Sequence, residues 1–323
     1  MQYQIQQFLP LIEQALQEMP VPETPASLYD PVRYFMKLPG KRIRPVFVLQ
    51  ALELFREPRP EDAKTALCTE LFHNFSLVHD DIMDKADLRR GFQTVHKKWN
   101  EPTAILSGDA LLVMAYDALM HAELRDLRPL LKSFNEMALA VCEGQQLDMD
   151  FSEQSRVSMS EYLDMIDRKT AALIAFSFGL GGFLGEASEE DNLILQQFGM
   201  AMGRCFQLRD DYLDLFGDEK ITGKKRGGDI GNFKLSHPVL ESMNDPDAGT
   251  FLAMWNNKSI DADLRLKAIL NWMEDAGIPE RCNAFLNQEM NAGISLLARV
   301  KNKNQEAANR IIFLCRELAF REK

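Results

Sequence analysis

Two segments with the same spacing of aspartates, each inside an apolar run, constrain this chain more than any other feature. The segment LVHDDIMD contains Asp80, Asp81 and Asp84, and the segment QLRDDYLD contains Asp210, Asp211 and Asp214. Residues three or four apart share one face of a helix, where like charges repel by roughly 0.2 to 0.5 kcal/mol per pair. We therefore expect a cation among the carboxylates of each segment, and two such faces could hold one ligand.

Helical periodicity also indicates which neutral groups accompany the aspartates. At about 100° per residue, His73 falls on the face of the first cluster and Gln207 on the face of the second. Sites made of carboxylate oxygens suit hard cations such as Mg²⁺, which is usually shared with a substrate phosphate. A solvated acidic face is the alternative, and it would be the better interpretation of a single cluster. Two copies in apolar surroundings favour Mg²⁺.

The distribution of prolines and apolar residues predicts an all-α fold. Nine of the 14 prolines lie in the first 60 residues, where helices at Gln2–Gln17 and Tyr29–Met36 are expected on either side of the loop PVPETP. Residues 61–101 and 130–237 contain no proline, and their apolar residues recur at helical spacing. The expected architecture is a bundle with both aspartate clusters on inner helices. Four glycines lie where helices could start, kink or stop: Gly108, Gly144, Gly217 and Gly277.

Length and composition bound the class of protein. A chain of 323 residues could hold two domains, but no linker, charge block or low-complexity segment divides it, so residues 1–323 are interpreted as a single domain. The net charge of −11 argues against nucleic acid as a partner. The five cysteines are widely spaced and odd in number, which favours reduced core residues over a zinc site or disulfides.

The most apolar stretch, Thr170–Gly185, is too short for a membrane span, and the N-terminus lacks the features of a signal peptide. We expect this stretch to form a buried central helix. We also expect a cytoplasmic protein.

Cationic side chains that could hold phosphate occur in four places. The segment GKRIRP near residue 40 is expected to open a helix, and helix N-terminal amides attract anions. Arginine can also hold phosphate through two parallel hydrogen bonds. The other places are Arg89 and Arg90, Lys169 before the apolar stretch, and the glycine-rich segment TGKKRGGDIGNFK. Each alone would more often be solvated charge, but together they favour a phosphate ligand.

The ordered set of motifs resembles the all-trans isoprenyl diphosphate synthases of the polyprenyl synthetase family. The set consists of GKRIRP, HNFSLVHDDIMD with LRRG and TVH, GQQLD at Gly144, RKT at Arg168, QLRDDYLD, and GGDI followed by Lys234. The resemblance implies the isoprenoid synthase type I fold, which is a single-domain antiparallel helix bundle around a deep central cavity and is usually homodimeric. It implies a prenyltransferase that joins isopentenyl diphosphate head-to-tail to an allylic diphosphate.

The resemblance also implies roles for individual residues. Two Mg²⁺ ions would be held by Asp80 and Asp84 and a third by Asp210, with support from Asp81, Asp211 and Asp214. The isopentenyl diphosphate ligands would be Lys41, Arg44, His73 and Arg90. The allylic diphosphate ligands would be Arg89, Lys169, Thr170, Gln207, Lys224 and Lys234. The candidate catalytic residues among these are Lys169, Thr170 and Gln207, and the oxygens of the last two would face the developing carbocation.

The chemistry explains why such residue types are needed. An allylic C–O bond ionises only if charge on the departing diphosphate is stabilised, which metal ions and preorganised cations supply in a dry site. The isopentenyl double bond then attacks the cation, and in the family the released pyrophosphate is thought to take the proton. This fits the lack of a Ser/His/Asp or Cys/His pattern in the sequence. His79 has no support as a ligand, and Gln145, Gln146 and Asp148 are expected to be structural.

In the family, bulky residues before the first aspartates form the floor of the cavity. Phe75 and Phe72 lie five and eight residues before Asp80, so the resemblance suggests a C15 or C20 product. The cluster lacks a two-residue insertion, which slightly favours geranylgeranyl diphosphate. Two ordinary core phenylalanines are the alternative, and an ideal helical wheel places Phe72 nearer the aspartate face than Phe75.

Some features depart from the family pattern. The basic loop has one more residue between Lys224 and Lys234 than several relatives have, and Phe233 replaces a small or polar residue. The C-terminal FREK is only weakly basic, so no tail is expected to close over the site, and residues after about 240 are expected to serve packing. Three other interpretations remain: a class I terpene cyclase, a head-to-head condensing enzyme, and a non-catalytic subunit of a heteromeric prenyl synthase.

Overall fold

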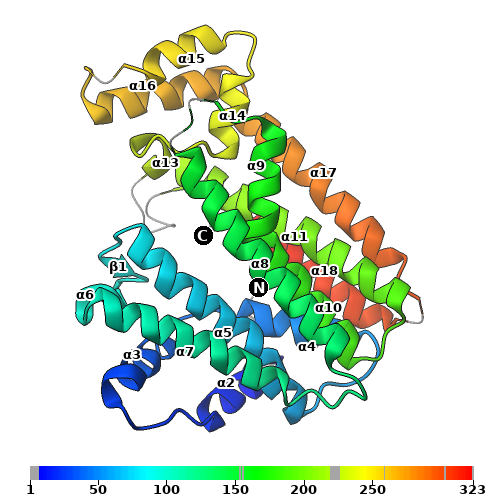
Figure 1. Ribbon diagram of the computed structural model, residues 1–323. Helices are drawn as coiled ribbons and strands as arrows, with labels where there is room; N and C mark the ends of the chain where they lie inside the picture. The colour runs from blue at the N-terminus through cyan, green and yellow to red at the C-terminus, as the bar shows by residue number, and fades with distance from the viewer. Residues whose placement is uncertain are drawn as a thin grey trace. The chain divides into compact units, whose positions relative to one another are not determined.

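The structure is a computed structural model that describes residues 7–152, 154, 156–218, 226–257, 259–301 and 303–321 (Figure 1). The helices in these residues are α2 (Leu9–Glu18), α3 (Ala26–Met36), α4 (Ile43–Glu53), α5 (Pro60–Met83), α6 (Val95–Lys98), α7 (Glu101–Leu119), α8 (Arg128–Phe151), α9 (Met159–Ile166), the π-helix η1 (Asp167–Ala171), α10 (Ala172–Leu184), α11 (Glu189–Phe216), α13 (Gly228–Gly231), α14 (His237–Met243), α15 (Ala248–Trp255), α16 (Ala262–Asp275), α17 (Ile278–Ala298) and α18 (Gln305–Ala319). Two short strands, β1 (Leu88–Arg89) and β2 (Phe92–Gln93), complete the described elements. The all-α prediction is confirmed.

The chain divides into two compact units, each assembled from separate stretches of sequence. The first unit consists of Met1–Ser133, Ser177–Leu193 and Lys301–Ile311, and the second of Phe134–Phe176, Ile194–Val300 and Ile312–Lys323. The first aspartate cluster belongs to the first unit and the second cluster to the second. The single-domain interpretation of residues 1–323 stays a prediction.

Helices α5 and α7 of the first unit pack side by side (Figure 1). Helix α5 begins at Pro60, where the fixed φ of proline suits the first position of a helix. Nearby, Phe47 of α4 stacks on Phe178 of α10 with their ring centroids 4.8 Å apart. These contacts hold in place the long helix that ends in the first aspartate cluster.

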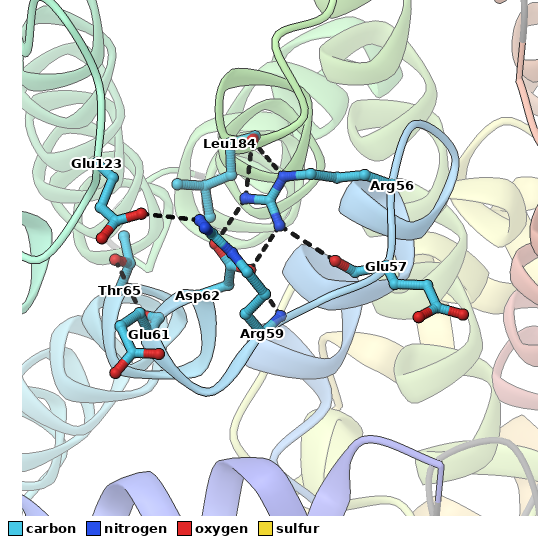
Figure 2. A network of polar contacts seen from close by, with 8 residues as sticks. All are labelled: Arg56, Glu57, Arg59, Glu61, Asp62, Thr65, Glu123 and Leu184. Carbon is cyan, nitrogen blue, oxygen red and sulfur yellow. Dashed lines mark hydrogen bonds and ion pairs between the residues drawn. The ribbon is translucent and has the colours of Figure 1, made fainter.

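Figure 2 shows how the start of α5 is anchored. The guanidinium of Arg56 donates two hydrogen bonds of 2.7 Å to the carboxylate of Asp62, and the backbone N–H of Arg59 donates a third to it at 2.7 Å. Arg56 Nη2 also donates to the carbonyl oxygen of Leu184, at the end of α10, over 3.1 Å. Burial alone would raise the pKa of Asp62, but the bonds from Arg56 and Arg59 lower it below its ordinary value.

A β-hairpin follows the first aspartate cluster and presents its two arginines. Arg89 pairs with Phe92 across the hairpin, and the turn between them consists of Arg90 and Gly91. Their φ angles are 54° and 82°, and both central residues of a type I′ turn require positive values. Strands of two residues are too short to show alternation, so this hairpin was not predictable from the sequence.

The second unit contains a separate hydrophobic core. Helices α15 and α16 pack side by side, and both α14 and α17 contact this pair (Figure 1). The buried residues of this core include Phe251, Trp255, Ile269, Met273 and Ile278. The core agrees with the expectation that many residues after 240 serve packing.

The observed helix bounds differ in part from the predicted ones. The predicted helix Gln2–Gln17 is observed as α2, which begins at Leu9 after a turn at residues 7–8 and runs one residue further, to Glu18; residues 2–6 lie outside the described part of the chain. The predicted helix Tyr29–Met36 begins three residues earlier, at Ala26. The stretch Thr170–Gly185 is largely buried and mostly helical as predicted, with α10 at Ala172–Leu184, but its first two residues belong to the π-helix η1, which was not expected.

Two of the four glycines serve close packing within helices. Gly217 follows the end of α11, and Gly277 caps α17 with a φ of 70°, as the prediction required. In contrast, Gly108 and Gly144 lie inside α7 and α8. A Cβ atom at position 144 would lie 2.2 Å from the backbone nitrogen of Lys169, so only glycine permits this approach.

The five cysteines are free, and four of them are buried as expected, whereas Cys142 is exposed. None of the helices in the described residues is both long and apolar enough to cross a membrane.

Candidate active site

The first aspartate cluster occupies the C-terminal end of α5. The helix ends at Met83, with Asp80 and Asp81 in its last turn and Asp84 as its C-cap. The C-terminal end of a helix carries partial negative charge, so each carboxylate is unfavourable there by about 0.3 to 1 kcal/mol. This position strengthens the expectation of a cation at the cluster.

The three aspartates have different surroundings. Asp81 is only 1% exposed, and its Oδ1 accepts hydrogen bonds from Arg89 Nε at 2.9 Å and Nη2 at 2.6 Å. Burial raises the pKa of Asp81, and the bond from Arg89 opposes that rise. Asp80 is more accessible, and Asp84 is exposed. Asp81 therefore orients Arg89, and its neighbours are better placed to meet a ligand.

Three of the four residues predicted to bind isopentenyl diphosphate lie near one another in the first unit. Burial lowers the pKa of His73 well below its ordinary value, and the positive charges of Arg44 and Arg90 lower it further. The imidazole of His73 is therefore neutral near pH 7 and lies within the field of both arginines. Arg90 Nη1 donates to the carbonyl oxygen of Pro39 at 2.6 Å. The fourth predicted ligand, Lys41, is exposed on the same segment, two residues after Pro39.

The GKRIRP motif also contains a structural arginine that its sequence does not distinguish from the other two cations. Arg42 is buried, and its Nη1 and Nη2 donate to Glu70 at 2.7 Å and to the carbonyl oxygen of Met36 at 2.8 Å. It has a φ of 48°, in the left-handed region, immediately before α4 begins at Ile43. The motif therefore contains a buried, structural arginine in addition to the two cations that were predicted to bind a ligand.

The second aspartate cluster lies in the last two turns of α11, again at the negative end of a helix. Asp214 Oδ2 accepts a 2.9 Å hydrogen bond from the backbone N–H of Asp229. A Cβ at Gly228 would lie 3.1 Å from Asp214 Oδ1, so the Gly-Gly-Asp segment wraps closely around this carboxylate. Burial raises the pKa of Asp229 to about 7, and the charge of Asp211 adds to the effect.

A chain of hydrogen bonds joins the predicted catalytic residues Thr170 and Gln207 to the second cluster. Thr170 Oγ1 donates to Gln207 Oε1 at 2.9 Å, and Gln207 Nε2 donates to Asp211 Oδ1 at 2.9 Å. Asp211 is itself buried, and its Oδ2 accepts from the Tyr162 hydroxyl at 2.5 Å and the His237 backbone N–H at 3.0 Å. Asp211 therefore fixes the amide of Gln207, which the wheel had placed on the aspartate face.

Lys169 has a partner that was predicted to be structural. Its Nζ donates to Asp148 Oδ2 at 2.5 Å. Burial alone would raise the pKa of Asp148, but the charges of Lys234 and Lys169 lower it below the ordinary value. Asp148 thus brings together two of the predicted allylic diphosphate ligands. Lys224, a further predicted ligand, lies outside the described residues.

Contrary to the expectation from the weakly basic FREK, a C-terminal residue reaches the second cluster. The guanidinium of Arg321 forms an ion pair with Asp210 and lies 4.4 Å from the ring centroid of Phe206. The carbonyl oxygen of Arg321 accepts a 2.8 Å hydrogen bond from Arg209 Nε. No motif surrounds Arg321, so the sequence contained no signal for this contact.

The unusual Phe233 has a packing explanation. Its ring meets Trp255 edge to face, with the centroids 5.3 Å apart, and the guanidinium of Arg265 lies 4.5 Å from its centroid. The residue next to Lys234 is thereby anchored in the core of the second unit.

The predicted chain-length residues lie on α5 with different burial. Phe72 is fully buried, Phe75 is partly exposed, and their ring centroids are 5.4 Å apart. The helical wheel had placed Phe72 nearer the aspartates, yet Phe75 is the more accessible ring.

The carboxylates present suit a Mg²⁺ ion that is shared with a bound substrate. Within the residues that the structure describes, no three His, Cys, Asp or Glu side chains converge to form a metal cage. Mg²⁺ commonly needs only one or two carboxylates, because waters and substrate phosphates complete its coordination. Within the first unit Asp80 and Asp84, and within the second unit Asp210, are accessible carboxylates of this kind at helix ends that disfavour negative charge.

An all-α fold with two aspartate-rich helix ends and separate cationic clusters defines a class of enzymes that act on prenyl diphosphates. The model of the family described as "Polyprenyl synthetase" matches residues 25–273. The chain is 39% identical over 234 residues to a geranylgeranyl diphosphate synthase of Methanosarcina mazei, with 72% of each chain covered. It is 38% identical over 238 residues to a short chain isoprenyl diphosphate synthase of Methanocaldococcus jannaschii, again with 72% of each covered.

A solved structure is also similar over the full length. A crystal structure of a geranylgeranyl pyrophosphate synthase superposes with a TM-score of 0.91 and 34% sequence identity, covering 100% of this chain and 99% of that one. The chain belongs to the polyprenyl synthetase family. It is a prenyltransferase that uses isoprenoid diphosphate substrates, and its fold is the all-α type I fold of isoprenyl synthases.

Proposed function

We propose that this enzyme condenses isopentenyl diphosphate head-to-tail with an allylic diphosphate in a Mg²⁺-dependent reaction that yields a C15 to C20 product. Geranylgeranyl diphosphate, the C20 product, is the favoured end point. The observation that carries the proposal is the presence of two accessible aspartate groups at helix C-termini, in addition to a basic cluster around His73. A diphosphate bound with Mg²⁺ would suit the two aspartate groups, and a second diphosphate would suit the basic cluster around His73.

The proposed roles follow from these surroundings. Asp80 and Asp84 would hold two Mg²⁺ ions and Asp210 a third, so that three ions would serve one active site. Arg89 would be held against the allylic diphosphate by Asp81, and Lys169 and Lys234 would act there under the control of Asp148. Lys224 is proposed for the same diphosphate from the motif alone.

The chain's own residues would carry the reaction as follows. When bound, Mg²⁺ would neutralise charge on the allylic diphosphate as its C–O bond breaks. The hydroxyl oxygen of Thr170 and the amide oxygen of Gln207, fixed by Asp211, would face the resulting carbocation. Arg44, Arg90, His73 and Lys41 would hold isopentenyl diphosphate while its double bond attacks C1 of the cation. Loss of a proton to the released pyrophosphate then restores a double bond and completes the product.

We propose that Phe75 limits the length of the product, with the buried ring of Phe72 behind it. Replacing Phe75 with alanine removes the accessible ring and is expected to lengthen the product beyond that of the wild type. The measurement is mass analysis of the products formed with excess isopentenyl diphosphate. If both Phe75→Ala and the double variant with Phe72→Ala give an unchanged product, these rings are ordinary core residues that do not limit its length.

We also propose that the enzyme is a homodimer. Three large apolar side chains seven residues apart, Leu106 and Val113 on α7 and Met120 at its C-cap, are 59%, 60% and 62% exposed. A second copy of the chain would remove them from water. Light scattering on the wild type should give twice the monomer mass, and Leu106→Asp with Val113→Asp should give monomers. A monomeric wild type at micromolar concentration would contradict the proposal.

The decisive experiment for the proposed function is a primer assay. The purified protein is incubated with Mg²⁺, isopentenyl diphosphate and, separately, dimethylallyl, geranyl or farnesyl diphosphate, and the products are sized by mass. A defined C15 or C20 product that a chelator abolishes is expected. A hydrocarbon or alcohol formed without incorporation of an isopentenyl unit would instead indicate a terpene cyclase. Inactivity with every primer would indicate a non-catalytic subunit.

A further inference from the structure

The imidazole of His79 occupies the space beside Gly108. A Cβ atom at position 108 would lie 2.3 Å from His79 Nε2 and 2.4 Å from Cδ2. Real Cβ atoms essentially never approach another heavy atom to less than 3.0 Å. Gly108 is buried in the middle of α7, and His79 comes from α5. The missing side chain at position 108 therefore forms a notch in α7 that receives the ring, and any larger residue would displace it.

A hydrogen bond fixes the orientation of the ring within this notch. His79 Nε2 lies 3.1 Å from the carbonyl oxygen of Ile105. A carbonyl oxygen can only accept, so Nε2 carries the proton and donates it. The notch and this bond together hold the imidazole against α7.

The fixed imidazole in turn supports the proposed chain-length residue. Its ring centroid lies 4.8 Å from that of Phe75, with the planes inclined by 66°. On its other side, Phe75 meets the fully buried Phe72 edge to face. Spacings of three and four residues place these three rings in a row on one face of α5. Phe75 is therefore held between a ring fixed by the core and a ring fixed by the notch.

We propose that Gly108 and His79 are positioning residues for product length: the notch at Gly108 holds His79 so that its imidazole fixes the ring of Phe75. This inference rests on the proposed function, because it requires that Phe75 limits elongation. Neither residue touches the reacting atoms in this role. They affect the product length at which elongation stops, and they do not act on the rate of each condensation.

The test compares the product-length distributions of the wild type and three variants. His79→Ala removes the support of Phe75 and is expected to raise the ratio of longer to wild-type-length product by about 2- to 10-fold, which corresponds to the loss of one aromatic edge contact. Gly108→Ala displaces the imidazole and is expected to change the ratio in the same direction. In Gly108→Ala with His79→Ala, the new methyl group no longer meets a ring, so the ratio should equal that of His79→Ala alone.

Two further variants separate positioning from a general structural effect. His79→Phe retains a ring edge beside Phe75 and is expected to restore the ratio towards that of the wild type. Gly249→Ala is the matched control, because a Cβ there meets nothing within 4 Å, and it should leave the ratio unchanged. If Gly108→Ala fails to fold, as judged by circular dichroism, the pair His79→Ala and His79→Phe still decides the question.

The outcomes distinguish this inference from the proposed function. Wild-type enzyme that incorporates no isopentenyl unit would overturn both. Wild-type enzyme that makes a defined prenyl diphosphate, with His79→Ala giving the same distribution, would overturn the positioning inference alone. A changed ratio in His79→Ala that His79→Phe reverses would support it.

Discussion

The two adjacent aspartates of each cluster have different surroundings, and the difference is the same in both clusters. Asp81 and Asp211 are buried and accept hydrogen bonds from protein donors, whereas Asp80 and Asp210 are more accessible. The second aspartate thus orients neighbouring side chains. The first is more exposed to solvent, although its sequence context is almost the same, and in the second cluster it pairs with Arg321.

Substitution of the accessible aspartates should impair chemistry far more than folding. Asp80→Ala and Asp210→Ala are each expected to lower kcat by about 10²- to 10³-fold, because charge on the departing diphosphate loses stabilisation. The melting temperature should change little. Asp211→Asn is the matched comparison within the second cluster, and it should lower the free energy of unfolding by about 1 to 3 kcal/mol because its buried donors lose their charged acceptor. Near-normal turnover of Asp80→Ala at saturating Mg²⁺ would contradict the catalytic role of the accessible aspartates.

Arg321 provides a cation at Asp210 in the structure, and a metal ion would have to compete with it. We expect Arg321→Gln to bind Mn²⁺ about 2- to 5-fold more tightly, a size typical of a partly exposed ion pair. Isothermal titration calorimetry measures this affinity directly. Arg316→Gln, on the exposed surface of α18, removes the same charge from the same segment and should leave the affinity unchanged. Equal affinities of the Arg321 variant and the wild type would show that the ion pair does not compete.

Among the elements, the π-helix η1 is the one that presents Lys169 and Thr170. Such turns often occur at functional sites and need support from the surrounding structure. Arg204 of α11 supplies it here, with Nε donating to Asp167 Oδ1 at 2.9 Å and Nη1 donating to Glu289 of α17 at 2.6 Å. These two bonds raise the pKa of Arg204 further above its already high ordinary value, although burial opposes the rise.

Removal of this support should disturb the π-helix. Arg204→Ala is expected to lower the free energy of unfolding by about 1 to 3 kcal/mol and to lower kcat, because Lys169 and Thr170 lose their defined positions. Urea unfolding and steady-state kinetics measure the two effects. Arg168→Ala is the control, since this neighbouring arginine forms ion pairs only at the exposed surface, with Asp164 and Glu143, and should cost at most about 1 kcal/mol. If Arg204→Ala and Arg168→Ala lose equal amounts of stability and activity, the π-helix does not depend on Arg204.

Elements were predictable where their signals are local. The GKRIRP motif indicated the start of α4, and the absence of proline in residues 61–101 and 130–237 indicated long helices. The turn of π-helix was not predictable, because Arg204 and Glu289, which stabilise it, are remote in sequence. Gly108 was predicted to lie where a helix could start, kink or stop, and its packing role was not predictable for a similar reason: it depends on the position of His79 beside it.

For the whole molecule, the order of motifs from Gly40 to Lys234 was sufficient to predict the family and the all-α fold. Contacts that join distant segments were not predictable. Arg321 follows the last motif by many residues, and nothing in its neighbourhood indicated Asp210 as a partner. The residues around Asp62 also belong to no motif, yet they connect the start of α5 to the end of α10.

The Asp62 network predicts how stability depends on acidity. The pKa of Asp62 in the folded protein is below its ordinary value, so between the two pKa values the unfolded chain binds more protons than the folded one. The contribution of Asp62 is therefore fully present above pH of about 4, the ordinary pKa of aspartate, and is lost as the pH falls through the folded-state pKa. Its hydrogen bonds from Arg56 and Arg59 suggest that Asp62 contributes about 2 kcal/mol to the free energy of unfolding.

Urea unfolding at a series of pH values tests this prediction. Asp62→Asn should be less stable than the wild type at pH 7, and the difference should shrink below pH of about 4, because the wild-type carboxylate is then protonated and its bonds to Arg56 weaken. Asp30→Asn is the control, since Asp30 pairs with Arg33 at the exposed surface, where solvent screens the interaction. A difference between Asp62→Asn and the wild type that stays constant down to pH 3 would mean that the network acts through packing, with no contribution from the charge of Asp62.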